Sequence, residues 1–341
     1  MARKVALIKG DGTGPELVDA TLKILRTVGT SIELIPCEAG FEWWQSHGGL
    51  TLIPDESWKI IETADACLKG PTTTPAAPNT PRSVAVSIRQ RMNLYANIRP
   101  VKTFEGTKRP LGDIELVCVR EATEGLYSGI EHRLSNDVAI AFRKITRGPS
   151  TKLAQRAFQE AKRKGWKRCI AITKQNILKE TDGLFMDSVR TVQKDYADIS
   201  VEEYFIDNFA QQLIKNPQRF NECILFGTNL FMDIISEEVS ALVASIGCIY
   251  SANFGDDYAM FEPAHGSAPS YKGQDKVNPT ATVLAAAWML EYLGEKKKAD
   301  AIFRATREII AEGKTVTYDL GGKARLSEMA NAIAERAKRD L

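Results

Sequence analysis

Short runs of valine, isoleucine and leucine alternate along the chain with amphipathic stretches of helical period, and this alternation constrains the fold more than any other feature. A strand at 4–9 and a helix at 15–28 form the first unit, with Pro15 in the first helical turn, where its missing N–H is tolerated. The other predicted elements are helices at 51–62, 150–164, 280–293, 296–312 and 326–341 and strands at 64–69 and 168–173. Strands separated by helices predict an α/β protein with a largely parallel sheet.

Composition excludes several classes of protein. The 341 residues carry 45 Lys and Arg against 43 Asp and Glu, so the net charge of +2 gives no reason to expect nucleic acid or an anionic membrane as a partner. No apolar stretch is long enough to span a bilayer and the N-terminus lacks a secretory pattern, so we expect a cytoplasmic protein. The six cysteines show no Cys-x-x-Cys spacing and are expected to be buried and reduced.

Two loops draw attention because each follows a predicted strand. Gly10-Asp-Gly-Thr-Gly is not a dinucleotide fingerprint, because Gly-x-Gly-x-x-Gly would need glycine at position 15, where Pro15 stands. We predict instead a tight turn with glycines at positive φ. The Pro- and Thr-rich segment 70–81 precedes an arginine-rich helix, so we expect a ligand-binding loop at the carboxyl end of the sheet rather than a linker.

Three acidic residues suggest a cation site. Asp233 and Glu237 are spaced i and i+4 on a predicted helix, where neighbouring carboxylates repel each other. A shared cation is one explanation of this pair, and a solvated helix face is the other. Asp207 adds a third acid in an apolar run, which favours the cation. Oxygen ligands suit Mg²⁺ or Mn²⁺ better than zinc.

Basic and phenolic side chains supply further candidates. Lys174 ends a strand and Tyr127 follows a glycine turn, so each could transfer a proton, although a solvated lysine and a packed tyrosine are the structural alternatives. The arginines are denser than a solvated surface requires: Arg82, Arg89, Arg91, Arg99 and Arg120. Because guanidinium groups bind carboxylates bidentately, converging arginines beside a metal predict a site for a small polycarboxylate.

Three motifs resemble those of the β-decarboxylating dehydrogenases, which act on isocitrate, homoisocitrate or 3-isopropylmalate: Gly10-Asp-Gly-Thr-Gly-Pro-Glu, Leu94-Tyr-Ala-Asn-Ile-Arg-Pro and Phe261-Glu-Pro-Ala-His-Gly-Ser-Ala-Pro. The resemblance covers nearly the whole chain. It implies a doubly wound α/β fold of the isopropylmalate dehydrogenase type, not a Rossmann fold. It also implies two domains, a large nucleotide-binding domain (1–99 plus 253–341) and a small domain (100–252) with the dimer interface and the catalytic Tyr and Lys. The implied assembly is a homodimer with shared active sites, and a tetramer is the larger alternative.

By this resemblance, Asp233 and Glu237 match the metal-binding acids of one subunit, and Asp207 matches the acid that reaches in from its neighbour, with Mg²⁺ or Mn²⁺ as the ion. Glu237 is one methylene longer than the usual aspartate, so we expect a shifted coordination shell. Lys174 matches the partner-subunit lysine that accepts the hydroxyl proton. Tyr127 matches the tyrosine that protonates the enolate after CO₂ leaves.

The implied substrate-binding residues are Thr73, Ser83, Arg89, Arg99 and Arg120. Ser83 matches the serine that bonds the distal carboxylate in isocitrate enzymes. An isopropylmalate enzyme would instead carry an acid and a leucine pair where Arg82, Ala85 and Val86 stand. The resemblance therefore indicates oxidative decarboxylation of isocitrate to 2-oxoglutarate.

Several alternatives stay open for the activity. Ala85 stands where isocitrate enzymes usually carry an asparagine, so homoisocitrate, or use of both substrates, is the alternative. A 3-isopropylmalate dehydrogenase and a non-catalytic regulatory subunit rank below it. Regulatory subunits typically lose catalytic positions, whereas Tyr127, Lys174, Asp207 and Asp233 are all present.

The implied cofactor-binding residues are Thr72, Glu262, His265, Gly266, Ser267, Ala268, Tyr271, Asn278, Tyr318 and Asp319. NAD-dependent members usually place an aspartate where Ser270 stands, which would repel a 2′-phosphate. Tyr271, Val277 and Tyr318 resemble NADP-dependent members, although the lysine usual at position 270 and the arginine expected near Gly322 are absent. The pattern favours NADP over NAD.

Overall fold

The computed structural model describes residues 2–77, 80–108, 111–243 and 245–341, and a ten-stranded sheet forms its centre. The strand order is β2-β1-β3-β12-β11-β4-β5-β10-β8-β9. These strands are β1 (Lys4–Ile8), β2 (Glu33–Cys37), β3 (Ala66–Lys69), β4 (Ala96–Lys102), β5 (Glu115–Glu121), β8 (Arg168–Thr173), β9 (Ser200–Phe205), β10 (Cys223–Gly227), β11 (Tyr250–Phe254) and β12 (Ala259–Pro263). A separate hairpin consists of β6 (Glu131–Arg133) and β7 (Ala139–Ala141).

The α-helices are α1 (Gly14–Thr27), α2 (Phe41–His47), α3 (Asp55–Thr63), α4 (Val84–Arg91), α5 (Arg147–Lys164), α6 (Lys179–Gln193), α7 (Ile206–Lys215), α8 (Asn229–Ser240), α9 (Thr280–Tyr292), α10 (Lys296–Glu312) and α11 (Leu326–Arg339). The helix predicted at 296–312 has these bounds in the structure. The one predicted at 51–62 begins only at Asp55, because Pro54 holds the residue before it out of helical geometry.

The sheet is parallel at both sides and antiparallel in the middle. β11 pairs antiparallel with β12 and β4, and β4 pairs antiparallel with β5, whereas the other pairs are parallel. The prediction of a largely parallel sheet is thus confirmed. The antiparallel centre was not predicted, because hydrophobic runs identify strands without reporting their direction.

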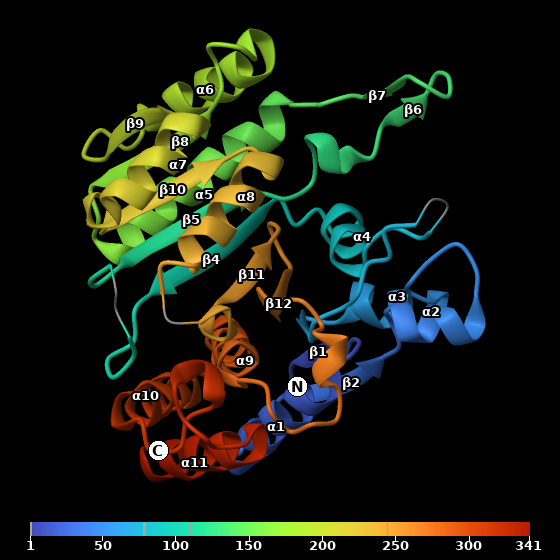
Figure 1. Ribbon diagram of the computed structural model, residues 1–341, viewed down its shortest axis with the longest axis vertical. Helices are drawn as coiled ribbons and strands as arrows, with labels where there is room; N and C mark the ends of the chain where they lie inside the picture. The colour runs from blue at the N-terminus through green and yellow to red at the C-terminus, as the bar shows by residue number, and fades with distance from the viewer. Residues whose placement is uncertain (1, 78–79, 109–110, 244) are drawn as a thin grey trace.

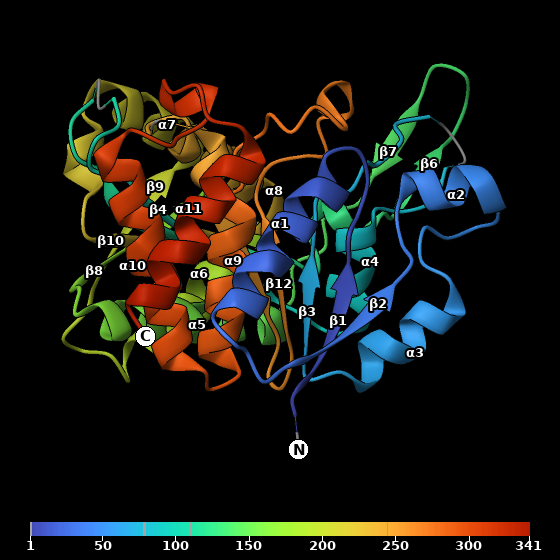
Figure 2. The same ribbon diagram turned by 90° about the horizontal axis from the view of Figure 1, so that it is seen from below.

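Helices cover both faces of the sheet, as a doubly wound fold requires. The first core lies between one face and helices α1, α5, α6, α9, α10 and α11, several of which stand in front in Figure 2. Two further cores lie on the other face, beneath α7 and α8 and beneath α3 and α4. Neighbouring residues of β10 show the alternation, since Phe226 packs in the first core and Leu225 in the second.

The two ends of the chain pack together, with α1 against α11, while residues of the middle segment form the other half of the sheet (Figure 1). The hairpin β6–β7 projects from the body of the molecule (Figure 1). Within the described residues, no helix combines the length and apolarity needed to cross a membrane. The six cysteines are free and buried, as expected.

Candidate active site

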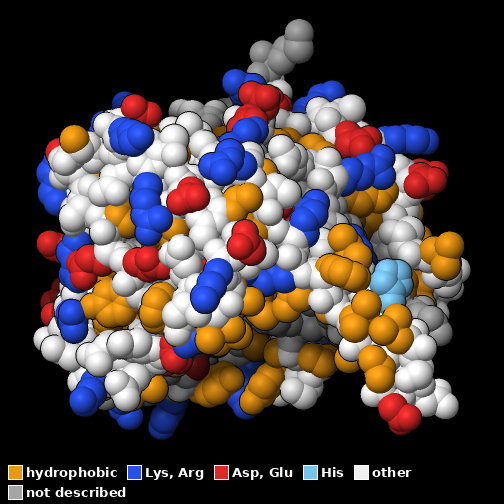
Figure 3. Space-filling model, turned by 90° about the horizontal axis from the view of Figure 1, so that it is seen from above, with side chains coloured by type: hydrophobic (Ala, Val, Ile, Leu, Met, Phe, Trp, Pro, Cys, Tyr) orange, Lys and Arg blue, Asp and Glu red, His pale blue; other side chains and the backbone are white. Residues whose placement is uncertain are grey.

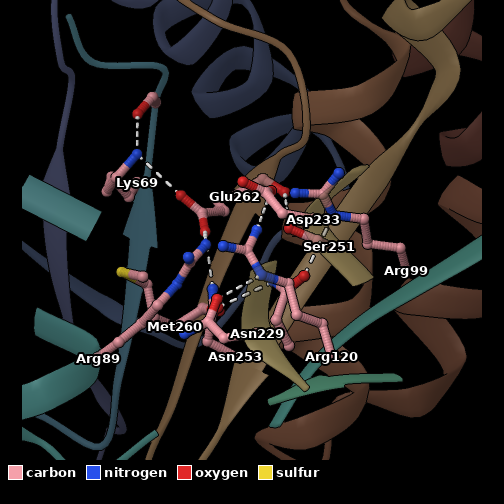
Figure 4. Close-up of polar contacts among 12 residues, drawn as sticks. Lys69, Arg89, Arg99, Arg120, Asn229, Asp233, Ser251, Asn253, Met260 and Glu262 are labelled. Atoms are coloured by element: carbon pink, nitrogen blue, oxygen red, sulfur yellow. Dashed lines mark hydrogen bonds and ion pairs between the residues drawn. The ribbon is translucent and has the colours of Figure 1, made fainter. Parts of the chain in front are cut away.

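Polar side chains gather where β4 and β11 lie side by side in the middle of the sheet (Figure 4). Asn97 and Arg99 come from β4, and Asn253 comes from β11. They point away from the first core, because side chains alternate between faces and their neighbours Ile98 and Ala252 belong to that core. The sequence thereby places a polar floor on the face of the sheet opposite its largest core.

A chain of hydrogen bonds crosses this floor from Arg99 to Arg89. Arg99 Nε donates to Asn97 Oδ1 at 3.1 Å, and Asn97 Nδ2 donates to Asn253 Oδ1 at 2.9 Å. Asn253 Nδ2 in turn donates to Glu262 Oε1 at 2.8 Å, which also accepts from Arg89 Nη2 at 2.9 Å. Because each amide both donates and accepts, the chain orients both guanidinium groups.

Glu262 is the charge centre of this floor. Its second carboxylate oxygen lies 2.9 Å from Lys69 Nζ, which also donates to the carbonyl of Gly70 at 2.9 Å. Burial alone would raise the pKa of Glu262, but Lys69 and Arg89 outweigh burial and hold the pKa well below its usual range. Glu262 is therefore ionised, and it neutralises part of the positive charge beside it.

A third buried arginine joins the site from β5. Arg120 Nε donates to Asn229 Oδ1 at 2.9 Å, and its Nη1 pairs with Asp233. Tyr127 donates its hydroxyl to the other oxygen of Asp233, and the Arg120 guanidinium lies 4.9 Å from the centre of the Tyr127 ring. Burial raises the pKa of Tyr127, with the hydrogen bond to Asp233 adding to the effect, so this phenol is protonated.

The three arginines Arg89, Arg99 and Arg120 point toward one another (Figure 4). Burial lowers the pKa of Arg120 to about 10, and the neighbouring charges of Arg89 and Arg99 add to the effect. The guanidinium group still carries its charge at neutral pH. Arg82 and Arg91 do not join this cluster: Arg82 is exposed and bonds Gln90, and Arg91 pairs with Glu62 at 2.6 Å. Of the five arginines noted in the sequence, the three expected to bind substrate are the ones that point toward one another.

The two acids of α8 face this cluster one helical turn apart, since Asp233 binds Arg120 and Glu237 binds Arg99. Asp207 lies elsewhere, with its carboxylate 2.7 Å from Lys174 Nζ, and this hydrogen bond lowers the pKa of Asp207. Within the described residues, no three His, Cys, Asp or Glu side chains meet in a group that could hold a metal ion. A single chain therefore presents two of the three expected oxygen ligands together. Their donor type fits a hard divalent cation.

Beside the arginines lies an inner cavity of about 170 Å³, lined by Lys69, Pro71, Thr72, Thr74, Ser83, Ala85, Arg89, Arg99, Ser251, Glu262, Pro263, Ala264, His265 and Gly266. The loop predicted to bind ligand thus does line a cavity. Arg89 Nε is buried there and has no hydrogen-bond partner among the described residues. A buried cationic donor without a partner is costly, so a ligand oxygen at this place would satisfy it.

An outer cavity of about 400 Å³ adjoins the inner one, because His265 and Gly266 line both. Its walls are Thr13, Ser245, Ile246, Gly247, His265, Gly266, Ala268, Tyr271, Val277, Asn278, Tyr318 and Asp319. Burial lowers the pKa of His265, and its Nε2 is buried without a partner in the described part of the chain. Because Nδ1 donates to the Gly266 carbonyl at 2.9 Å, Nε2 of the neutral ring can accept one hydrogen bond from a ligand.

Asp319 and a pair of tyrosines shape the outer cavity. The Asp319 carboxylate accepts hydrogen bonds from Ser245 (2.6 Å), Asn278 (2.9 Å) and Thr317 (2.6 Å), so its position is fixed. The Tyr271 and Tyr318 rings lie 6.2 Å apart. Lys276 Nζ lies 4.9 Å from the Tyr271 ring centre and 4.8 Å from that of Tyr318. An aromatic wall with a cation beside it suits an adenosine that carries negative charge.

The glycine loop holds the surrounding loops together. The buried Asp11 carboxylate accepts hydrogen bonds from the backbone N–H groups of Phe41 (3.0 Å), Glu42 (2.9 Å) and Thr73 (2.8 Å). A Cβ at Gly10 would lie 2.0 Å from the Pro71 carbonyl oxygen, and Gly10 has φ +79°, as predicted for a tight turn. The glycine loop therefore connects the end of its own strand to segments 41–42 and 71–73.

Two expected binding residues also form hydrogen bonds that connect these loops. Thr73 Oγ1 lies 2.6 Å from Ser267 Oγ, and the Ser267 carbonyl accepts from the backbone N–H of Thr13 at 2.9 Å. Neither Thr73 nor Ser267 lines the cavity for which it was predicted, and the expected cofactor residues Thr72 and Glu262 line the inner cavity. Sequence reasoning missed Asp11 and Lys69 as organisers. The signal for Lys69 was a charged residue at the end of an otherwise apolar strand.

Comparison with known proteins agrees with this geometry. The family model for isocitrate/isopropylmalate dehydrogenase matches residues 4–333. A 3-isopropylmalate/3-methylmalate dehydrogenase of Methanocaldococcus jannaschii is 40% identical over 99% of both chains. A probable NAD isocitrate dehydrogenase subunit alpha, mitochondrial, of Drosophila melanogaster is 38% identical and is matched over 98% of this chain and 87% of its own length.

The structural comparison points the same way. The crystal structure of isocitrate dehydrogenase from Methylococcus capsulatus is similar with a TM-score of 0.93 and 41% identity, and the match covers 98% of this chain and 99% of the other. Among the sequence relatives, a homoisocitrate dehydrogenase of Methanocaldococcus jannaschii is 38% identical over 99% of both chains. The names of these relatives therefore cover several different substrates.

Proposed function

Because the chain belongs to the isocitrate/isopropylmalate dehydrogenase family, whose members are β-decarboxylating oxidoreductases, we propose that it oxidatively decarboxylates isocitrate to 2-oxoglutarate with a nicotinamide cofactor. The observation that carries this proposal is the convergence of Arg89, Arg99 and Arg120 on one face of the sheet. All three are buried, and together with Lys69 they carry four positive charges against the three negative charges of Glu262, Asp233 and Glu237. Several guanidinium groups at one place with a net positive charge favour a ligand with more than one carboxylate.

Ser83 is the residue that favours isocitrate over 3-isopropylmalate. It precedes α4 and lines the inner cavity, where its hydroxyl can bond a distal carboxylate. The neighbouring Ala85 lines the same cavity and offers no leucine-sized apolar surface for an isopropyl group. Because alanine also leaves more space than the usual asparagine, homoisocitrate, one methylene longer, is the second candidate.

The proposed roles of the reacting groups follow the family pattern. A neutral Lys174 of a second copy accepts the hydroxyl proton, and a bound nicotinamide would supply the acceptor for the hydride that leaves the carbinol carbon. The β-keto acid then loses CO₂, and the protonated Tyr127 returns a proton to the enolate. Mg²⁺ or Mn²⁺ held by Asp233, Glu237 and a second copy's Asp207 would supply positive charge beside the reacting oxygen.

We propose NADP as the preferred cofactor. Ser270 introduces no negative charge at the position where an aspartate would repel a 2′-phosphate. Tyr271 and Tyr318 line the outer cavity, and Lys276 Nζ lies 4.9 Å and 4.8 Å from their ring centres and adds positive charge beside them.

We propose a homodimer that shares its active sites. We call the hairpin β6–β7 with its flanking residues, 130–142, the arm. Its exposed apolar side chains are Ile130, Leu134, Val138, Ile140 and Phe142, with exposed fractions between 37% and 63%. Hydrophobic side chains also gather on the face seen in Figure 3. An apolar hairpin that the described residues of its own chain leave exposed favours a partner, and a second copy is the partner that the shared site needs.

A matrix of steady-state rates tests the proposal: isocitrate, homoisocitrate and 3-isopropylmalate, each with NAD and NADP and with Mg²⁺ or Mn²⁺. We expect isocitrate with NADP to have the highest kcat/KM and to exceed 3-isopropylmalate by orders of magnitude, because a buried polar site rejects a ligand that leaves it unpaired. A comparable kcat/KM for 3-isopropylmalate would overturn the substrate assignment. Absence of turnover with all three would favour the regulatory-subunit alternative.

A further inference from the structure

A second cleft lies behind the candidate active site, on the opposite face of β4 and β11. It has a volume of about 560 Å³ and continues into a smaller cavity of about 100 Å³, because Pro100, Lys164, Tyr250, Phe303 and Arg307 line both. We call the two together the rear cleft. The family comparisons and the proposed reaction give it no role.

The rear cleft and the inner cavity share their walls. Successive side chains of a strand point to opposite faces. Pro100 and Tyr250 line the rear cleft, while the residues beside them in sequence, Arg99 and Ser251, line the inner cavity. A ligand in the rear cleft would therefore contact the same two strands that carry the substrate floor.

The charged side chains that line the rear cleft are not all paired. Three of its four acids, Glu291, Asp300 and Glu308, pair with cations that do not line the cleft. Lys296 lies 3.9 Å from Glu291 and 3.1 Å from Asp300, and Arg336 lies 2.6 Å from Glu308. The fourth acid, Glu115, pairs with two cations of the lining, Lys102 and Lys164.

The two remaining paired cations of the lining have acids outside it, since Arg163 pairs with Glu160 and Arg304 with Asp340. The fifth lining cation, Arg307, pairs with no acid among the described residues, so positive charge remains available there.

Two of these cations form a natural anion site. Arg304 and Arg307 are spaced i and i+3 on α10, so they lie on one face of the helix. Arg304 pairs with Asp340 at 3.2 Å, whereas Arg307 has no hydrogen bond or ion pair within the described chain. Guanidinium groups one turn apart can both bond a phosphate, and each can do so bidentately.

The same cleft has a wall of three aromatic rings. Tyr250 lies 5.8 Å from Trp288 and 6.1 Å from Phe303 between ring centres, and all three line the cleft. Aromatic walls with a few convergent charged groups, in a cavity of several hundred Å³, are typical of small-molecule sites. The aromatic wall and the arginines together restrict the kind of ligand more than either feature does alone.

We propose that the rear cleft binds a small phosphate ester that carries a flat ring, such as a nucleoside monophosphate. The ring lies against Tyr250, Trp288 and Phe303, and the phosphate bonds Arg304 and Arg307. Occupation of the cleft changes the affinity of the inner cavity for its anionic substrate, since β4 and β11 form both walls. Only this coupling rests on the proposed function, because it takes isocitrate as the substrate.

Titration calorimetry on the assembled full-length protein tests the site. NAD or NADP is present at saturation, so that the outer cavity is filled and does not bind the probe. GMP and phenyl phosphate should bind, and inorganic phosphate should bind about tenfold more weakly because it lacks the ring. Binding that the nicotinamide nucleotide abolishes, or equal binding of inorganic phosphate, would overturn the proposal.

Matched variants locate the binding. Arg307→Gln should weaken GMP binding by about tenfold or more, as expected for the loss of a charged phosphate contact. Arg339→Gln removes an exposed arginine of α11 that does not line the cleft and should leave GMP binding unchanged. Equal affinity of Arg307→Gln and wild type would place the ligand elsewhere and overturn the assignment.

The coupling has its own readout. The dissociation constant of isocitrate, measured by calorimetry without turnover, should change several-fold when GMP is present, and GMP affinity should change by the same factor when isocitrate is present. An unchanged isocitrate affinity would overturn the coupling. Failure of the protein to bind isocitrate at all would contradict the proposed function, while the GMP titrations would still test the rear cleft.

Discussion

Lys174 Nζ lies 2.7 Å from the Asp207 carboxylate, so one chain presents a proton-transfer candidate and a metal-ligand candidate as a single ion pair. The pair is apart from Asp233 and Glu237, which bind Arg120 and Arg99 instead. Because these two groups of residues lie apart on one chain, we propose that each active site takes Asp233 and Glu237 from one copy and Lys174 and Asp207 from another. This separation makes the sharing of active sites open to a direct experiment.

Lys174→Met and Tyr127→Phe should each reduce kcat by about a hundredfold or more, since each removes a general acid or base. When the two variants are refolded together, about a quarter of wild-type activity should return, because half of the dimers are mixed and one site in each combines intact residues. Steady-state rates of the mixture against each variant alone provide the measurement.

The control for this experiment is Lys179→Met, which removes an exposed lysine at the start of α6 and should leave kcat unchanged. If the mixture stays as inactive as its parts while circular dichroism shows folded protein, Lys174 and Tyr127 act within one chain and the shared site is wrong.

Glu262→Gln should destabilise the fold by about 3 to 5 kcal/mol at neutral pH, because it removes the partner of two buried cations, Lys69 and Arg89. The pKa of Glu262 lies below its ordinary value near 4.3. Its stabilising contribution is therefore complete above that value and is lost as the pH falls toward the folded-state pKa. Urea unfolding between pH 7 and pH 3 should show a shallower acid decline in the variant.

Glu62→Gln is the matched control, since Glu62 forms an exposed pair with Arg91 and should contribute less than about 1 kcal/mol. An identical acid decline in Glu262→Gln and wild type would show that Glu262 is not ionised in the folded state.

Lys276→Gln should raise KM for NADP about tenfold and leave KM for NAD unchanged, because the ammonium beside Tyr271 and Tyr318 would pair with a 2′-phosphate. Lys272→Gln serves as the control, since Lys272 already pairs with Glu42 at 2.6 Å. Equal effects of Lys276→Gln on both nucleotides would contradict NADP selectivity at this position.

Phe142→Ser should weaken the dimer, because Phe142 is a large apolar side chain of the arm with 54% exposure in the single chain. Sedimentation velocity over a range of concentrations should show a monomer fraction that is absent in the wild type. Leu50→Ser alters a side chain that is 98% exposed and lies outside the arm, and it should have no effect. A dimer of unchanged stability in Phe142→Ser would exclude the arm as the interface.

Regular elements could be predicted well from the sequence, because their signals are local. The helical period correctly predicted both ends of α10, and Pro15 predicted the start of α1 to within one residue. The order of strands in the sheet could not be predicted, since β4 and β11 pair across about 150 residues of sequence. The polar relay through Asn97 and Asn253 depends on this pairing and was missed with it.

Site residues with local signals were found, and those with distant partners were not. Asp233 and Glu237 stand out by their helical spacing. Asp11 bonds backbone groups 30 to 62 residues away, which no local pattern reports. Resemblance identified Thr73 and Ser267, but their bond to each other depends on the approach of two loops that meet only in the folded chain.

Ser83, just before α4, and Ala85, within α4, lie beside the polar floor, and under the proposed function this placement separates two tasks that many enzymes combine. In that proposal the arginines, fixed through central strands, bind what the candidate substrates have in common. Ser83 and α4 would then meet the part in which the substrates differ. New substrate preferences would therefore be accessible, in evolution or in a mutant library, through substitutions in this one segment. The arginines that bind the shared carboxylates would stay unchanged.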